Sequence, residues 1–202
     1  MKIAPGEACF VGGNIVMKKE ESNYTIADIE ALPEGKREEL IDWKMYMMAS
    51  PSFTHQRILA FLGNKFYNYI EEKQGKCVVI PAPFAVYLDE KNNYVEPDLV
   101  VICDQNKIDE KGCHGGPDLV IEIVSSSSMK MDYMLKLFKY RICGVQEYWI
   151  VDPDKNRVQV YGLTRDDMRE YTFTDQIPVG IYDGDLMIDL SKFPRMQSAA
   201  DE

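Results

Sequence analysis

Residues 97–124 read PDLVVICDQNKIDEKGCHGGPDLVIEIV, two short apolar runs that each begin with Pro-Asp. Nearly continuous aliphatic runs of this length are typical of central strands that are covered on both faces. The polar segment 104–116 between them carries three glycines and predicts a loop. We therefore expect two buried strands, Asp98–Cys103 and Leu119–Val124.

Glu122 stands among five aliphatic residues in the second run. A buried carboxylate costs several kcal/mol unless a cation pairs with it or a metal binds it. Because side chains alternate along a strand, Glu122 and Asp98 would converge if the two strands were neighbours with these residues level. Two carboxylates and the backbone carbonyl of Ile123 are the hard oxygen ligands that Mg²⁺ or Mn²⁺ prefers. Asp118, about 13 Å away along the same strand, is interpreted as a strand-entry residue.

The flanking sequence predicts a single α/β or α+β domain. We expect a leader at 1–23, one domain at 24–196 and a flexible tail at 197–202. A short helix capped by Thr25 and Asp28 precedes a strand or strand pair at 38–50 that bends near Asp42. A long helix at 53–73 has a buried face of Ile58, Leu59, Leu62, Phe66, Tyr69 and Ile70. Further elements are strands at 77–80 and 84–88, a helix at 129–142, and a hairpin at 147–151 and 157–161. We expect the 129–142 helix to bury Met131, Met134 or Leu135, Phe138 and Ile142.

The composition is that of a soluble globular protein, with 46% hydrophobic and 28% charged residues. The net charge of −10 repels polyanions and gives no support to a nucleic-acid partner. No apolar run has the length of a membrane span and no signal peptide is evident, which predicts a cytoplasmic protein without a membrane partner. The five cysteines form no CxxC pair, so we expect reduced thiols rather than zinc ligation or a disulfide framework.

Several segments together resemble a known family. They are EELID (38–42), PSFTHQ (51–56), EPDLVVICD (96–104), KGCHGGPDLVIEIVS (111–125) and EYWIVDP (147–153), joined by Asp132, Lys136, Tyr140 and Gly144. The pattern resembles the Uma-two family of restriction-endonuclease-like proteins, a branch of the PD-(D/E)XK nuclease superfamily. The resemblance implies a restriction-endonuclease-like fold, in which helices flank a central mixed β-sheet and further strands follow at the C-terminus.

The same resemblance implies a catalytic site of Asp98, Glu122 and Lys136, with Glu39 as a fourth member. The superfamily's usual lysine position, two residues after the glutamate, is Val124 in this sequence. Lys136 on the following helix is therefore the candidate that orients the attacking water. The sequence also departs from the family at Trp43, where glycine is usual, and at Ser126, where proline is usual.

Each candidate also has a structural interpretation. Asp98 could be a turn residue after Pro97, Lys136 could pair with Asp132 on a solvated helix face, and Glu39 could form a salt bridge near Lys36 or Arg37. The two histidines form no zinc cluster. His55 could lie near a substrate or complete a packing face, and His114 is typical of a hydrogen-bonding loop residue. The serines at 125–128 are interpreted as helix-capping residues rather than nucleophiles.

Three functions remain open from the sequence. The first is a Mg²⁺-dependent or Mn²⁺-dependent endonuclease that hydrolyses DNA, with specificity supplied by loops or by a homodimer. The second is a protein of the same fold without cleavage activity, acting as a binding or assembly module, which the net charge favours. The third is an enzyme that acts on another phosphate substrate.

Overall fold

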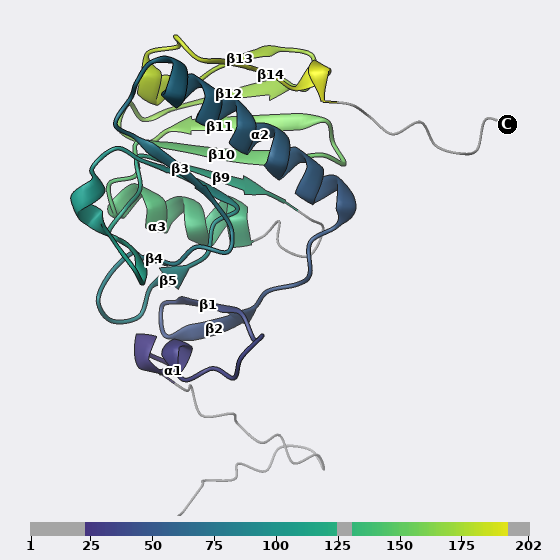
Figure 1. The fold of residues 1–202 in the computed structure, drawn as a ribbon. Helices are drawn as coiled ribbons and strands as arrows, with labels where there is room; N and C mark the ends of the chain where they lie inside the picture. Colours follow the sequence, from purple (N-terminus) through teal and green to yellow (C-terminus); the bar gives the residue numbers. More distant parts are fainter. Residues whose placement is uncertain (1–22, 125–130, 194–202) are drawn as a thin grey trace, which may run out of the picture.

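A computed structural model describes residues 23–124 and 131–193, with the side chains of 131–133 outside the description. A central six-stranded sheet has the strand order β12-β11-β10-β9-β6-β3 (Figure 1). Strands β9 and β10 are parallel, and the other neighbouring pairs are antiparallel, so the sheet is mixed as predicted. Its strands are β3 (Val78–Pro81), β6 (Leu99–Ile102), β9 (Leu119–Ile123), β10 (Glu147–Asp152), β11 (Arg157–Gly162) and β12 (Asp167–Thr172). The division into leader, domain and tail stays a prediction.

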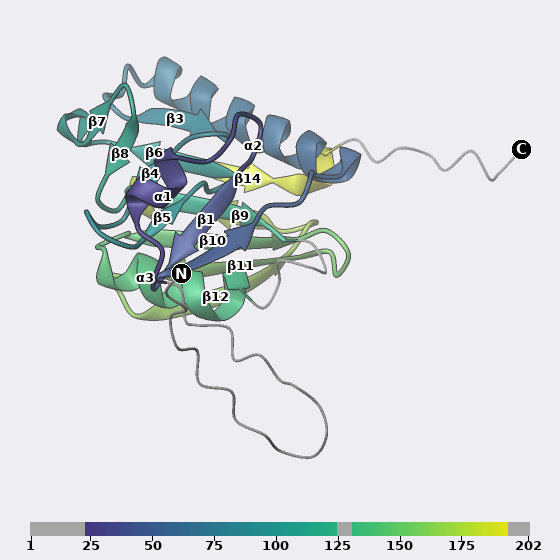
Figure 2. The same cartoon turned by 90° about the horizontal axis from the view of Figure 1, so that it is seen from below.

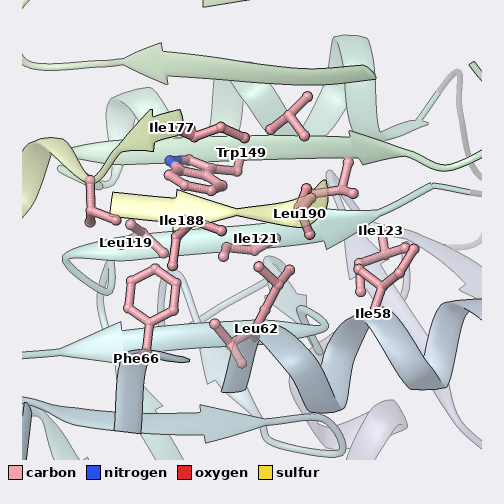
Figure 3. Close-up of a cluster of buried hydrophobic side chains, with 14 of the residues drawn as sticks. Ile58, Leu62, Phe66, Leu119, Ile121, Ile123, Trp149, Ile177, Ile188 and Leu190 are labelled. Atoms are coloured by element: carbon pink, nitrogen blue, oxygen red, sulfur yellow. The ribbon is translucent and has the colours of Figure 1, made fainter. Parts of the chain in front are cut away.

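One face of this sheet is covered by the long helix α2 (Phe53–Glu72) and the hairpin β13 (Gln176–Pro178) and β14 (Met187–Asp189). The predicted apolar face of α2 is confirmed, because its buried side chains pack on Leu119, Ile121 and Trp149 (Figure 3). These helix residues are Ile58, Leu59, Leu62, Phe66 and Ile70. Tyr69, which the sequence placed on the same face, is only partly buried.

The other face carries α3 (Leu137–Ile142) and a second six-stranded sheet of order β2-β1-β5-β4-β8-β7. Figure 2 shows α2 and α3 on opposite sides of the central sheet. A π-helical turn, η2 (Met131–Lys136), leads directly into α3. The strands of the second sheet are β1 (Glu38–Ile41), β2 (Lys44–Met47), β4 (Val86–Tyr87), β5 (Tyr94–Val95), β7 (Ile108–Asp109) and β8 (Gly112–His114). The remaining elements are α1 (Ile26–Glu30) and the 3₁₀ turns η1 (Gln105–Lys107), η3 (Gly180–Tyr182) and η4 (Leu190–Lys192).

The register of β6 and β9 confirms that the two apolar runs are neighbours. The strands are antiparallel, with Leu99 opposite Ile121 and Val100 opposite Val120. Continuing this register by one residue places Asp98 level with Glu122.

The helix after β9 is oriented differently from the prediction. Four of its apolar side chains face outward and are 40% to 64% exposed, whereas Lys136, Lys139 and Tyr140 are buried. The predicted buried face was therefore wrong for Met134, Leu135, Phe138 and Ile142; the side chain of Met131 lies outside the description. The physical reason is that the sheet presents carboxylates to this helix, and cationic and hydroxyl groups satisfy them.

The expectation of reduced thiols was wrong for one pair, because Cys77 and Cys103 form a disulfide. Val78 of β3 lies opposite Ile102 of β6, so the two cysteines meet at the next position of the antiparallel ladder. The two cysteines are 26 residues apart in the sequence, so the sequence alone does not show that they meet. Cys113 and Cys143 are free.

Across the described ranges, no helix combines the length and the apolar character that are needed to cross a bilayer.

Candidate active site

Three predicted residues form a buried charged cluster. Lys136 Nζ lies 2.8 Å from Glu122 Oε1 and 2.9 Å from Glu39 Oε1. All three side chains are at most 6% exposed. They come from η2, β9 and β1, elements that are far apart in the sequence. One lysine thus places its positive charge against two buried carboxylates.

Tyr140 completes the environment of Glu122. Its hydroxyl donates a hydrogen bond of 2.8 Å to Glu122 Oε1, the same oxygen that Lys136 contacts. Burial raises the pKa of Tyr140 well above its ordinary value, and the charge of Glu122 adds to the effect. The hydroxyl therefore stays protonated and remains a donor. Tyr140 follows Lys136 by four residues, which is about one helical turn. This spacing is the signal in the sequence that could have predicted both residues at one site.

Glu39 is held by a second polar group that sequence reasoning did not find. The backbone N–H of Glu96 donates to Glu39 Oε1 at 3.0 Å. The carboxylate of Glu96 accepts from Arg37 Nε at 2.7 Å and from the hydroxyl of Tyr94 at 2.7 Å. Arg37 is therefore engaged by Glu96, and the ion pair of Glu39 is with Lys136.

Asp98 lies beside this cluster, at the entrance to β6. Its Oδ2 accepts a hydrogen bond of 2.7 Å from the backbone N–H of Ile123 and lies 3.1 Å from His55 Nε2. The carboxylate is therefore next to the peptide unit that links Glu122 to Ile123. Asp98 connects β6, β9 and the first turn of α2, which is more than a local turn residue would do.

The donor set fits a hard divalent cation in its chemistry, because Asp98, Glu122 and the carbonyl of Ile123 offer only oxygen ligands. Within residues 23–124 and 131–193, no three or more His, Cys, Asp or Glu side chains converge as a ready-made metal site. In the described arrangement Lys136 supplies the positive charge next to Glu122.

The secondary candidates have structural roles. Asp118 accepts hydrogen bonds from the backbone of Cys103 at 2.7 Å and from Gln146 Nε2 at 2.6 Å, which confirms it as a strand-entry residue. His114 Nε2 lies 3.0 Å from Asp109 Oδ2 at the surface. The serines at 125–128 and the side chain of Asp132 lie outside the described residues.

The fold is similar to that of a known structure. A crystal structure described as "a putative nuclease belonging to DUF820" from Anabaena variabilis matches with a TM-score of 0.69 and 20% sequence identity. The match covers 84% of this chain and 97% of that chain. The two chains therefore share a fold, in which helices flank a mixed sheet as the sequence predicts.

The sequence comparison defines the family. Residues 26–181 match the Uma2 family, which is described as "Putative restriction endonuclease". The chain belongs to this family. It is also 24% identical over 132 residues to the uncharacterized protein slr1290 of Synechocystis, a match that covers 63% of this chain and 67% of that protein.

Proposed function

We propose that the protein is a Mg²⁺-dependent or Mn²⁺-dependent endonuclease that hydrolyses phosphodiester bonds of DNA in the cytoplasm. The observation that carries this proposal is the buried cluster of Glu39, Glu122 and Lys136, with Asp98 at the adjoining amide of Ile123. Membership of the family described as "Putative restriction endonuclease" supports the same proposed function.

Each residue has a distinct role in the proposed reaction. Asp98, Glu122 and the carbonyl of Ile123 would hold the divalent ion, which when bound would supply Lewis-acid polarisation of the phosphodiester and a lower pKa for water. Lys136 orients that water through its ammonium group and stabilises the charge that develops on the phosphate. Glu39 holds Lys136 from the opposite side and provides a carboxylate for a second ion or its water shell.

A second candidate is a binding or assembly module that keeps the fold without cleavage. The net charge of −10 favours it, since most non-specific DNA affinity comes from phosphates neutralised by basic residues. An enzyme acting on another phosphate substrate is the third.

Plasmid cleavage tests the proposal. Supercoiled DNA is incubated with Mg²⁺ or Mn²⁺ and the parent protein, Glu122→Ala or Lys136→Ala. We expect nicking by the parent and at least a 100-fold lower rate for both variants, the scale of losing a charge-stabilising group. Lys139→Ala is a matched control from the same helix, because Lys139 pairs with Asp42 outside the cluster.

The outcomes separate the candidates. Cleavage that persists in Glu122→Ala and Lys136→Ala would refute the site assignment. DNA binding by the parent without cleavage, under any of these metal conditions, would favour the binding module. Cleavage of RNA or a small phosphodiester in place of DNA would favour the third candidate.

We also propose a homodimer. The outward side of η2 and α3 carries four exposed apolar side chains at helical spacing: Met134, Leu135, Phe138 and Ile142. This set, named the α3 stripe, is an apolar surface that a second copy of the chain would cover.

A further inference from the structure

His55 makes a contact with Asp98 that the proposed roles do not use. His55 Nε2 lies 3.1 Å from Asp98 Oδ2, and the two side chains are only 14% and 17% exposed. The pair joins the first turn of α2 to the start of β6. Ser52, the N-cap of α2, accepts a hydrogen bond of 3.2 Å from the backbone N–H of His55 and so fixes the turn that carries the imidazole.

The contacts of Asp98 define the orientation of its carboxylate. Oδ2 receives both the backbone N–H of Ile123, at 2.7 Å, and the imidazole of His55. An ionised carboxylate accepts hydrogen bonds only, so the contact is a hydrogen bond when the imidazole carries a proton on Nε2. Neither of these two donors engages Oδ1. The carboxylate is therefore held through one oxygen, beside the peptide unit that follows Glu122.

The second nitrogen of the imidazole argues against a packing role. Nδ1 of His55 is buried and has no hydrogen-bond partner among the described residues. A buried polar atom without a partner is unfavourable and calls for an explanation. An apolar side chain would fill the same space without this cost, so the contact of Nε2 with Asp98 is the feature that explains a histidine here.

We infer that His55 is a positioning residue of the proposed metal centre, which sets the orientation of the Asp98 carboxylate for the divalent ion. The inference rests on the proposed function. It assigns His55 no contact with substrate, because its effect passes through Asp98. Groups that orient a metal ligand from behind typically change metal affinity by about 10-fold to 100-fold when they are removed.

The test measures Mn²⁺ binding to the full chain by electron paramagnetic resonance and, in parallel, the Mn²⁺ concentration that gives half-maximal plasmid nicking. We expect His55→Leu to raise both concentrations about 10-fold to 100-fold, with smaller changes in the rate at saturating Mn²⁺. His55→Gln, whose amide can still donate to Asp98, should recover most of the affinity. A purely structural role would lower thermal stability without this selective change in metal dependence.

His114→Leu is the matched control. It removes a second histidine from an aspartate pair, His114 with Asp109, at a nearly identical distance of 3.0 Å. That pair lies at the surface on β7 and β8 and should leave Mn²⁺ affinity unchanged.

The outcomes distinguish the inference from the proposed function. Parent-like Mn²⁺ affinity in His55→Leu, with cleavage intact in the parent, would overturn the role of His55 alone. No Mn²⁺ binding and no cleavage by the parent would overturn the proposed function and this inference with it. If His55→Leu fails to fold, His55→Gln and His55→Asn decide, since parent-like affinity in Gln and weaker affinity in the shorter Asn support the role. Equal affinity in these two variants would refute it.

Discussion

Lys136 is the buried cation that pairs with two buried carboxylates. Its ammonium group contacts Glu39 and Glu122, both almost fully buried and carried by strands of two different sheets. A buried ion pair adds little stability compared with an apolar contact, but removal of one partner leaves an uncompensated charge. Lys136 therefore has a role in the proposed chemistry and also in the stability of the packing of η2 and α3 on the two sheets.

We predict that Lys136→Met lowers the free energy of unfolding by about 3–5 kcal/mol, because two buried carboxylates lose the ammonium group that contacts both. Lys139→Met in the same helix is the control: its partner Asp42 is 60% exposed and can be hydrated after the change. Urea denaturation of both variants measures the difference. Equal losses of stability would contradict the assignment of Lys136 as the compensating charge.

Trp43 stands in a backbone conformation that suits glycine. The β1–β2 hairpin closes through Asp42 and Trp43, whose φ angles are +49° and +65°. Two-residue hairpin turns of this kind require positive φ at both positions, and asparagine, aspartate and glycine adopt it most readily. The departure from the family's usual glycine therefore leaves the hairpin intact, with the strain borne by Trp43.

We predict that Trp43→Gly stabilises the protein by about 0.5–1 kcal/mol, because the left-handed conformation costs a side-chain-bearing residue about 1–2 kcal/mol and the flexibility of glycine offsets part of the gain. Trp43→Ala keeps the Cβ atom and loses the exposed ring, so it should bring no gain. The free energies of unfolding of the three proteins decide. A Trp43→Gly protein less stable than Trp43→Ala would exclude backbone strain as the dominant effect.

At the scale of elements, features that follow from local sequence patterns were predicted correctly, whereas features that depend on pairing between distant segments were not. The strands β6 and β9 and the helix α2 follow from aliphatic runs and helical periodicity, and the capping of α1 by Thr25 and Asp28 is also confirmed. The prediction of the buried face of α3 was wrong because apolar periodicity carries no information about the carboxylates that β1 and β9 present to this helix. The disulfide was missed because it depends on the pairing of β3 with β6.

The same distinction between local pattern and tertiary contact applies to the candidate site. Asp98, Glu122, Lys136 and Glu39 could be named from sequence, and the structure places them at one end of β6 and β9. Glu96 and His55 acquire their partners only through tertiary contacts, since each contacts a residue on a different element. No spacing rule in the sequence identifies such partners.

Glu147 fixes the start of β10 to the segment that follows β13. Its carboxylate accepts hydrogen bonds from Trp149 Nε1 at 2.6 Å and from the backbone N–H of Ile181 at 2.8 Å. Burial raises the pKa of Glu147 above its ordinary value, although these hydrogen bonds and the charge of Arg165 oppose the effect. The folded state therefore holds this proton more tightly than the unfolded state does.

We predict that the stability of the parent relative to Glu147→Gln falls as the pH rises. A raised folded pKa contributes stability that is complete below the unfolded pKa, about 4.3, and is lost as the pH passes through the folded pKa. Glu147→Gln removes this titration, so the difference in unfolding free energy should shift in favour of the variant between about pH 4 and pH 7. Urea denaturation across this range measures it, and a difference that stays constant would contradict the prediction.

At the scale of the whole molecule, charge and apolar surface are distributed unevenly. The chain carries a net charge of −10, yet the outward side of η2 and α3 carries the four exposed apolar side chains of the α3 stripe. The inward face of the same segment has buried Lys136, Lys139 and Tyr140. This inversion of the usual pattern follows from the carboxylates beneath the helix, and it leaves the α3 stripe as a surface for association.

We predict that the chain sediments at twice its mass of 23.2 kDa and that Phe138→Lys with Ile142→Lys shifts it to a monomer. Two ammonium groups within an apolar contact would have to be desolvated, and loss of a central aromatic side chain alone typically costs about 2 kcal/mol or more in an interface. Met168→Lys with Met187→Lys changes the charge equally at exposed positions on β12 and β14, so it should leave the dimer intact. Sedimentation equilibrium over a range of protein concentrations measures both variants, and circular dichroism checks that each is folded. A parent that is monomeric throughout, or a stripe variant as dimeric as the parent, would show that the α3 stripe is not the contact between two copies.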